Sequence, residues 1–245
     1  MKMKSLIAAL LMAGTLAMAQ KPKSQKEAEA VNAIITATTP DQKIAAADNL
    51  LSKYKDTQFK SMALQMEGEA YGQKGDGPNA IVYGDRSIEA DPKNFQALLL
   101  VSSQIARMTK EFDLDKDEKL KRATKLANDA IAAIGTAEKP NPQLTDDQWT
   151  GIKKDLTSEA HETLGMIASV DKKPDAAIAE LKTAIDGANS PAYTAMVRLI
   201  SVYNNTKKYD DSTALADKLI ASGAPDNLKK IAQEEKVRAA KGKGQ

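Results

Sequence analysis

One group of residues in this 245-residue sequence has the types and spacing of a metal site. Asp113, Asp115 and Asp117 alternate as they do at the start of a calcium-binding loop. Such a loop needs a glycine next and a glutamate at its twelfth position, where this sequence has Glu118 and Thr124. We therefore favour a solvated loop that leads into a helix with an acidic first turn, and we expect no metal.

A catalytic site would need a base, and His161 is the only histidine. Glu159 and Glu162 lie beside it, but acidic residues are common on helix surfaces and do not indicate catalysis. The sequence contains no G-x-S-x-G nucleophile motif and neither of the glycine-rich phosphate-binding motifs. We therefore expect no enzyme activity and no cofactor.

The composition argues against several other classes of protein. Cysteine is absent, which excludes disulfides and thiolate metal sites. Lys and Arg total 35 against 33 for Asp and Glu, and Lys2 and Lys4 supply the whole excess. Because the rest of the chain is electrically balanced, we expect it to bind neither nucleic acid nor anionic lipid.

The first nineteen residues have the pattern of a secretory signal peptide. Lys2 and Lys4 give a positive start, residues 5–16 are mostly apolar, and residues 17–19 read Ala-Met-Ala. The apolar stretch is shorter than the roughly 18–20 residues that a membrane span requires. We expect cleavage after Ala19, no stable membrane insertion afterwards, and a periplasmic or secreted product.

The remaining sequence has helical periodicity almost throughout. Apolar residues recur at steps of three and four, as in the run Ile44, Ala47, Leu50, Leu51 and Tyr54. No segment shows the sustained alternation of a strand, so we expect an all-α protein.

These helices repeat with a period of about 35 residues. Small and large residues return at the same offsets in three segments: Leu64, Gly68, Tyr71, Ala80 and Pro92 in the first, Leu164, Gly165, Ala168 and Ala177 in the second, and Leu199, Tyr203, Ser212 and Ala216 in the third. One helix pair cannot bury its apolar stripe alone, so the pairs must stack on one another.

This pattern resembles the two-helix repeat of the tetratricopeptide repeat (TPR) family. The resemblance implies a right-handed α-solenoid of about five antiparallel helix pairs. Copies lie near residues 27–60, 61–94, 95–139, 158–191 and 193–226, between a flexible lead at 20–26 and a capping helix and basic tail at 227–245. We expect the last five residues, 241–245, to be disordered.

The sequence departs from the family pattern at several positions. Leu64, His161 and Met196 stand where the family prefers tryptophan, and Glu67 stands where it prefers leucine. We therefore interpret His161 as a residue that packs between repeats.

Two segments interrupt the repeat. The third copy carries an insertion near residues 111–116, and residues 139–142 form a rigid loop with two prolines. Thr145 and Gln148 then match a capping box, so we expect the first helix of the fourth copy to begin about three turns early.

In the TPR family, the first helix of each repeat, helix A, lines a concave groove that holds ligands. Carried over copy by copy, the partner-binding positions are Gln65, Glu69, Gln73, Ser103, Arg107, Glu162, Met166, Arg198, Ser201 and Asn205. Their mixed charge favours a polar, extended partner segment.

The resemblance and the export signal together predict a non-catalytic scaffold or assembly factor of the bacterial cell envelope, with a protein or extended peptide as its partner. An alternative is a periplasmic binder of a small solute or cell-wall fragment, which would need an enclosed pocket. A hydrolase would need paired carboxylates from different helices in one cleft.

Overall fold

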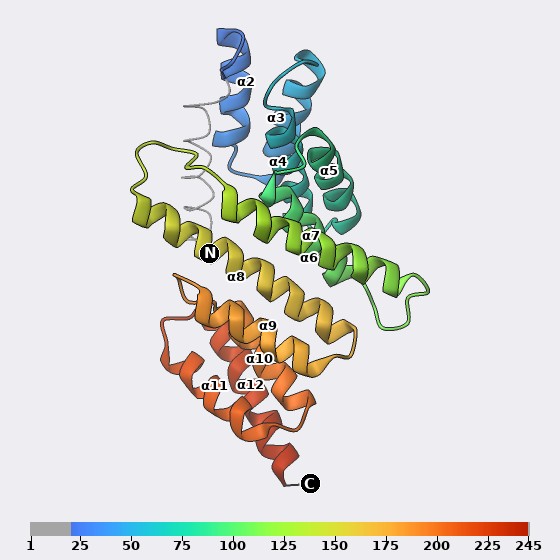
Figure 1. Cartoon of the computed structure of the whole chain (residues 1–245), viewed down its shortest axis with the longest axis vertical. Coiled ribbons are helices and arrows are strands. Elements are labelled where there is room, and N and C mark those ends of the chain that lie inside the picture. Colours follow the sequence, from blue (N-terminus) through green and yellow to red (C-terminus); the bar gives the residue numbers. More distant parts are fainter. Residues whose placement is uncertain (1–20, 245) are drawn as a thin grey trace. The chain divides into compact units, whose positions relative to one another are not determined.

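The computed structural model describes residues 21–244, and this part of the chain contains eleven α-helices and no strand (Figure 1). The all-α fold class is thus confirmed, while the signal segment 1–19 lies outside the described residues. The helices are α2 (Gln25–Thr36), α3 (Pro40–Lys53), α4 (Lys60–Gln73), α5 (Gly77–Ala90), α6 (Phe95–Met108), α7 (Lys116–Thr136), α8 (Asp146–Val170), α9 (Pro174–Gly187), α10 (Tyr193–Asn205), α11 (Tyr209–Ala221) and α12 (Asp226–Lys243).

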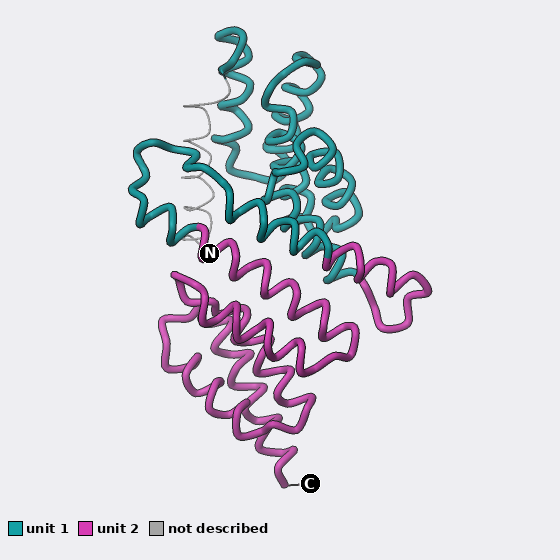
Figure 2. Tube along the Cα trace, viewed as in Figure 1, with its two compact units in different colours: residues 1–108, 125–152 teal, residues 109–124, 153–245 magenta. Residues whose placement is uncertain are grey.

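These helices form two compact units (Figure 2). Of the described residues, the first unit contains 21–108 together with 125–152, and the second contains 109–124 together with 153–244. In the first unit, each helix from α2 to α6 packs against the next one along the chain. In the second unit, α9 to α12 do the same, so both units are built from consecutive antiparallel helices.

The beginnings of several helices are set by local sequence. Thr39 and Gln42 form a complete capping box at the start of α3, with Pro40 in the first turn. At α8 the Gln148 amide donates to the Thr145 hydroxyl at 3.2 Å, and the Thr145 amide donates to the Gln148 side chain at 2.9 Å. The predicted capping box is therefore confirmed, and α8 begins at Asp146.

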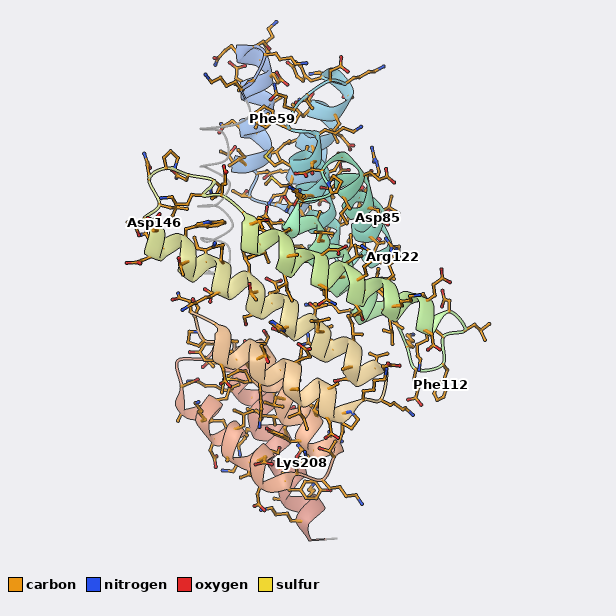
Figure 3. The ribbon with its side chains drawn as sticks, viewed as in Figure 1. Phe59, Asp85, Phe112, Arg122, Asp146 and Lys208 are labelled. Carbon is orange, nitrogen blue, oxygen red and sulfur yellow. The ribbon has the colours of Figure 1, made fainter. Side chains whose placement is uncertain are left out.

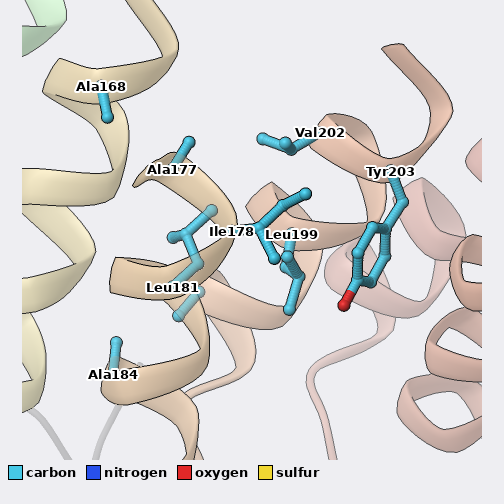
Figure 4. Close-up of a cluster of buried hydrophobic side chains, with 9 residues drawn as sticks. Ala168, Ala177, Ile178, Leu181, Ala184, Leu199, Val202 and Tyr203 are labelled. Carbon is cyan, nitrogen blue, oxygen red and sulfur yellow. The ribbon is translucent and has the colours of Figure 1, made fainter. Parts of the chain in front are cut away.

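Each unit buries its own apolar clusters. One cluster of the first unit contains Phe59, Ile34, Leu50 and Met66, contributed by α2, α3, α4 and the residue that precedes α4. A cluster of the second unit joins α8, α9 and α10 around Leu181 (Figure 4). Several of its members are alanines, which let the helices approach closely.

Two glycines lie where paired helices approach each other closely. A Cβ atom on Gly165 of α8 would lie 2.6 Å from Cγ of Leu181 on α9. A Cβ on Gly68 of α4 would lie 3.1 Å from the Ala80 carbonyl oxygen and 3.2 Å from the Gly84 nitrogen on α5. No side chain fits at either contact without a shift of its neighbours.

Helix α12 extends further than the sequence suggested. It continues to Lys243, so the expectation of disorder was wrong for residues 241–243. Lys243 pairs with Asp210 of α11, and two lysines in the last turn lie next to the negative end of the helix dipole. Gly242 also packs so closely on Tyr209 that a Cβ there would lie 2.4 Å from the ring.

In the described residues, no helix combines the length and apolar character that crossing a membrane would require.

Replacement of Gly165 by alanine should destabilise the protein, because the added methyl group meets the buried Leu181 side chain. We expect a loss of about 1–3 kcal/mol, measured by thermal or urea unfolding. The matched control is Gly135→Ala in α7, where a Cβ would meet nothing within 4 Å. There, helix propensity alone should make the change neutral or slightly stabilising. Equal effects at the two sites would contradict the close contact.

Candidate functional site

In the second unit, one polar cluster joins α8 and α10. Glu162 on α8 accepts a hydrogen bond from the Thr194 hydroxyl at 2.7 Å and from Nε of Arg198 at 2.8 Å, both on α10. The Glu162 side chain is 14% exposed and that of Arg198 is 34% exposed. A mostly buried carboxylate thus holds a guanidinium that still reaches the surface.

This arrangement leaves the terminal nitrogens of the Arg198 guanidinium available to bind a ligand. Its Nε donates to Glu162, and among residues 21–244 its two terminal nitrogens have no hydrogen-bond partner. A guanidinium can present two parallel N–H donors to a carboxylate or phosphate. Because one edge is already fixed by Glu162, Arg198 loses little conformational entropy when a ligand binds its other edge.

The end of α10 is tied to α12. Asn205 accepts a hydrogen bond from Nη2 of Arg238 at 2.6 Å. The side-chain nitrogen Nδ2 of Asn204 donates to the backbone and side-chain oxygens of Glu235 at 2.9 and 2.6 Å. The buried Oδ1 of the same side chain has no hydrogen-bond partner among the described residues. Ser201, one turn before Asn205, is half-buried. Asn205 is exposed but already bonded, so it is less available to a ligand than Arg198 is.

The other positions from the predicted groove have varied surroundings. Met166 in the second unit is buried. In the first unit, Gln65 is 1% exposed and its Nε2 has no hydrogen-bond partner, whereas Glu69 is half-buried and Gln73 is exposed.

On α6, the half-buried Ser103 hydroxyl donates to the Leu100 carbonyl at 3.0 Å, and Arg107 is exposed. Among the ten predicted positions, Glu162 and Arg198 are joined by a hydrogen bond. The groove itself stays a prediction.

A buried carboxylate in the first unit was not singled out by sequence reasoning as a titrating group. Glu67 on α4 is completely buried, and neither of its oxygens has a partner in good hydrogen-bond geometry. Around it lie Tyr83 and Arg86 of α5 and Asp48 of α3. The Tyr83 ring stacks on Tyr71 with centroids 5.1 Å apart, and the Arg86 guanidinium lies 5.0 Å from the centre of the Tyr83 ring.

The surroundings of Glu67 change how it titrates. Burial raises the pKa of Glu67 from 4.5 to about 7, and the negative charge of Asp48 adds to this effect. The Tyr83 hydroxyl and Arg86 act in the opposite direction but more weakly. Burial and the neighbouring Glu67 in turn raise the pKa of Tyr83 to about 12. The sequence signal was the glutamate at a position where the repeat pattern has leucine.

At two other candidate sites, the side chains contact charged neighbours. His161 is half-buried, and its Nδ1 lies 2.7 Å from a carboxylate oxygen of Glu180 on α9. Asp113 and Asp115 both pair with the Lys119 ammonium, at 3.1 and 2.8 Å, so a lysine cation offsets part of their charge. Within residues 21–244, no group of three acidic or histidine side chains could hold a metal ion.

Among the comparisons with known proteins, only the comparison of structures finds similar proteins. No family model matches the sequence, and no curated protein matches it. The structure is similar to TTC0263, a thermophilic TPR protein of Thermus thermophilus, with a TM-score of 0.56 and 16% identity over 84% of this chain and 91% of that one. It is also similar to a MamA RS-1 ArsTM double mutant, with a TM-score of 0.53 and 14% identity over 90% of this chain and 96% of that one.

The chain has a TPR fold. The α-solenoid class predicted from the repeat pattern is confirmed by these similarities, which at such low sequence identity concern the fold. In TPR terms, α4, α6, α8 and α10 are helix A of successive repeats, and each is followed along the chain by its helix B. The cluster of Glu162, Thr194 and Arg198 therefore lies on the helix A surface of the TPR fold.

Replacement of Glu67 by glutamine should stabilise the TPR fold at high pH. Between pH 4.5 and 7 the folded chain keeps a proton on Glu67 that the unfolded chain has lost, so the stability of the wild type falls as the pH rises through this window. Glu67→Gln removes this loss. We expect it to be more stable than the wild type by about 1–3 kcal/mol at pH 8 and nearly equal at pH 5.

Urea unfolding at the two pH values measures this difference. The matched control is Glu89→Gln on α5, because Glu89 is exposed. If the advantage of Glu67→Gln over the wild type is the same at both pH values, the proposed titration of Glu67 is wrong.

Proposed function

We propose that this chain is an exported, non-catalytic protein-interaction scaffold or assembly factor of the bacterial cell envelope. It binds an extended segment of a partner protein along the helix A surfaces of its repeats. The observation that carries this proposal is the Glu162–Thr194–Arg198 cluster, where a prearranged guanidinium lies on the helix A surface of the second unit.

The chemistry of this cluster defines the kind of segment that fits. The open edge of Arg198 suits a carboxylate, from an acidic side chain or a chain terminus, in bidentate geometry. Ser201 is half-buried one turn further along α10, where it can offer a hydroxyl to a backbone group of the segment. The recognition is polar and the surface is preformed, so binding needs little rearrangement.

The fold and the sequence support the remaining parts of the proposal. A TPR fold offers extended helical surfaces that suit the binding of another protein. The signal pattern of residues 1–19 supports export. A binder of a small solute or cell-wall fragment is the alternative, and the experiment below separates it from the scaffold.

Replacement of Arg198 by glutamate should weaken partner binding at least tenfold. The charge pair between Arg198 and a carboxylate of the partner is lost, and the new glutamate repels that carboxylate. Residues 20–245 would be used to capture partners from an envelope extract of the parent cell at low and high salt. The affinity of each recurrent partner would then be measured for the wild type and for Arg198→Glu.

The matched control is Lys182→Glu on α9, which makes the same change of charge at an exposed position of the same unit. We expect it to leave the affinity within about threefold of the wild type, as is typical of a charge outside an interface. Equal losses for the two variants would contradict a site at Arg198. An absence of protein partners, together with thermal stabilisation by a cell-wall fragment, would favour the alternative.

A further inference from the structure

The loop between α6 and α7 exposes two large apolar side chains. Phe112 is 87% exposed and Leu114 is 107% exposed, the highest values among the exposed large hydrophobic residues of the described chain. Figure 3 labels Phe112 on this loop. The loop lies in the insertion that separates the third repeat from the family pattern. Two apolar side chains so close together and so exposed are unfavourable in water.

Hydrogen bonds within the loop give it a defined shape. The Asp113 amide donates to the Lys110 carbonyl at 3.2 Å, and the Lys116 amide donates to the Asp113 carbonyl at 3.1 Å. The Asp113 carboxylate accepts from the Lys110 amide at 3.1 Å and pairs with Lys119 at 3.1 Å. The Lys110 amide and then the Lys119 ammonium lower the pKa of Asp113, so this carboxylate stays charged and bonded at neutral pH.

Ion pairs also fasten the loop to the rest of the second unit. Glu111 pairs with Lys172, which lies in the turn between α8 and α9. The Lys116 ammonium lies 3.9 Å from a carboxylate oxygen of Asp171 in the same turn. The charged residues of the loop thus bond to the protein, while the apolar residues between them point outward. This is the reverse of the usual arrangement, in which apolar side chains are buried.

The charge around the two side chains restricts what could cover them. Residues 110–119 contain five acidic residues and three lysines, and Asp117 and Glu118 are exposed. An anionic membrane surface would be repelled by this net negative charge. A protein surface with an apolar pocket and basic residues at its edge would gain from both the apolar and the charged groups.

We propose that Phe112 and Leu114 form a second docking element, which inserts into an apolar pocket edged by lysine or arginine on a partner protein. This element is separate from the helix A surface at Arg198, so it is tested independently of the proposed function. Insertion removes both side chains from water, and the ion pairs that hold the loop keep the ordering cost low.

The first test places a photo-reactive phenylalanine analogue at position 112 of the full chain, in the parent cell. We expect one discrete adduct, with the cross-link on apolar residues of a partner protein that has lysine or arginine beside them. The matched control carries the same analogue at Val237 of α12, another exposed apolar position of the second unit, and should not give this adduct. No adduct at 112, or the same adduct at both positions, would overturn the proposal.

The second test uses purified proteins. With the partner so identified, Phe112→Ser combined with Leu114→Ser should weaken binding at least tenfold and leave the melting temperature unchanged. Glu118→Lys should weaken binding at least threefold, because it reverses an exposed acidic charge beside the loop. Unchanged affinity of the double serine variant would overturn the proposal.

Phe112 and Leu114 could instead contact a membrane or a second copy of this chain, and two direct measurements test these alternatives. Flotation with phosphatidylcholine vesicles, with or without one third phosphatidylglycerol, would indicate a membrane if the wild type bound and the double serine variant did not. Sedimentation would indicate a second copy of this chain if the wild type dimerised and that variant did not. Either result would overturn the proposal of a different partner protein.

Discussion

The distance at which paired helices meet is the constraint on which both units depend. At Gly165 and Gly68 the helices are so close that one added carbon atom would overlap a neighbour. Such contacts need small residues on one helix and a well-placed larger residue on the other, as with Leu181 opposite Gly165. The alanine-rich clusters follow from this spacing, since thin layers of helices leave little room for large side chains.

Much of the fold could be predicted because it depends on local signals. The capping boxes at Thr39 and Thr145 involve residues three apart in sequence, so the sequence alone locates the starts of α3 and α8. The repeat period adds the order of the helices, because each pair must stack on the next. The end of α12 was missed, because Lys243 is held by Asp210, 33 residues earlier in the chain.

The candidate site was harder to predict, since exposure depends on the exact rotation of each helix. Gln65 and Met166 matched groove positions by register, yet both side chains are buried. A different signal was present in the sequence. Arg198 and Glu162 are 36 residues apart, close to one repeat, and the pair of Lys74 and Asp41 is separated by 33. Opposite charges one repeat apart therefore indicate contacts between neighbouring repeats.

Helix α12 covers the apolar surface that α10 and α11 leave open, with Ala232 packed against Leu219 and Met196 in one cluster. Its other side carries charged residues, among them Lys230, Glu234 and Arg238. A stack of helix pairs has an apolar face at its end, on which a further helix pair can pack. Helix α12 thus replaces the apolar face of α10 and α11 with a surface that carries charged side chains, as the terminal helices of repeat proteins commonly do.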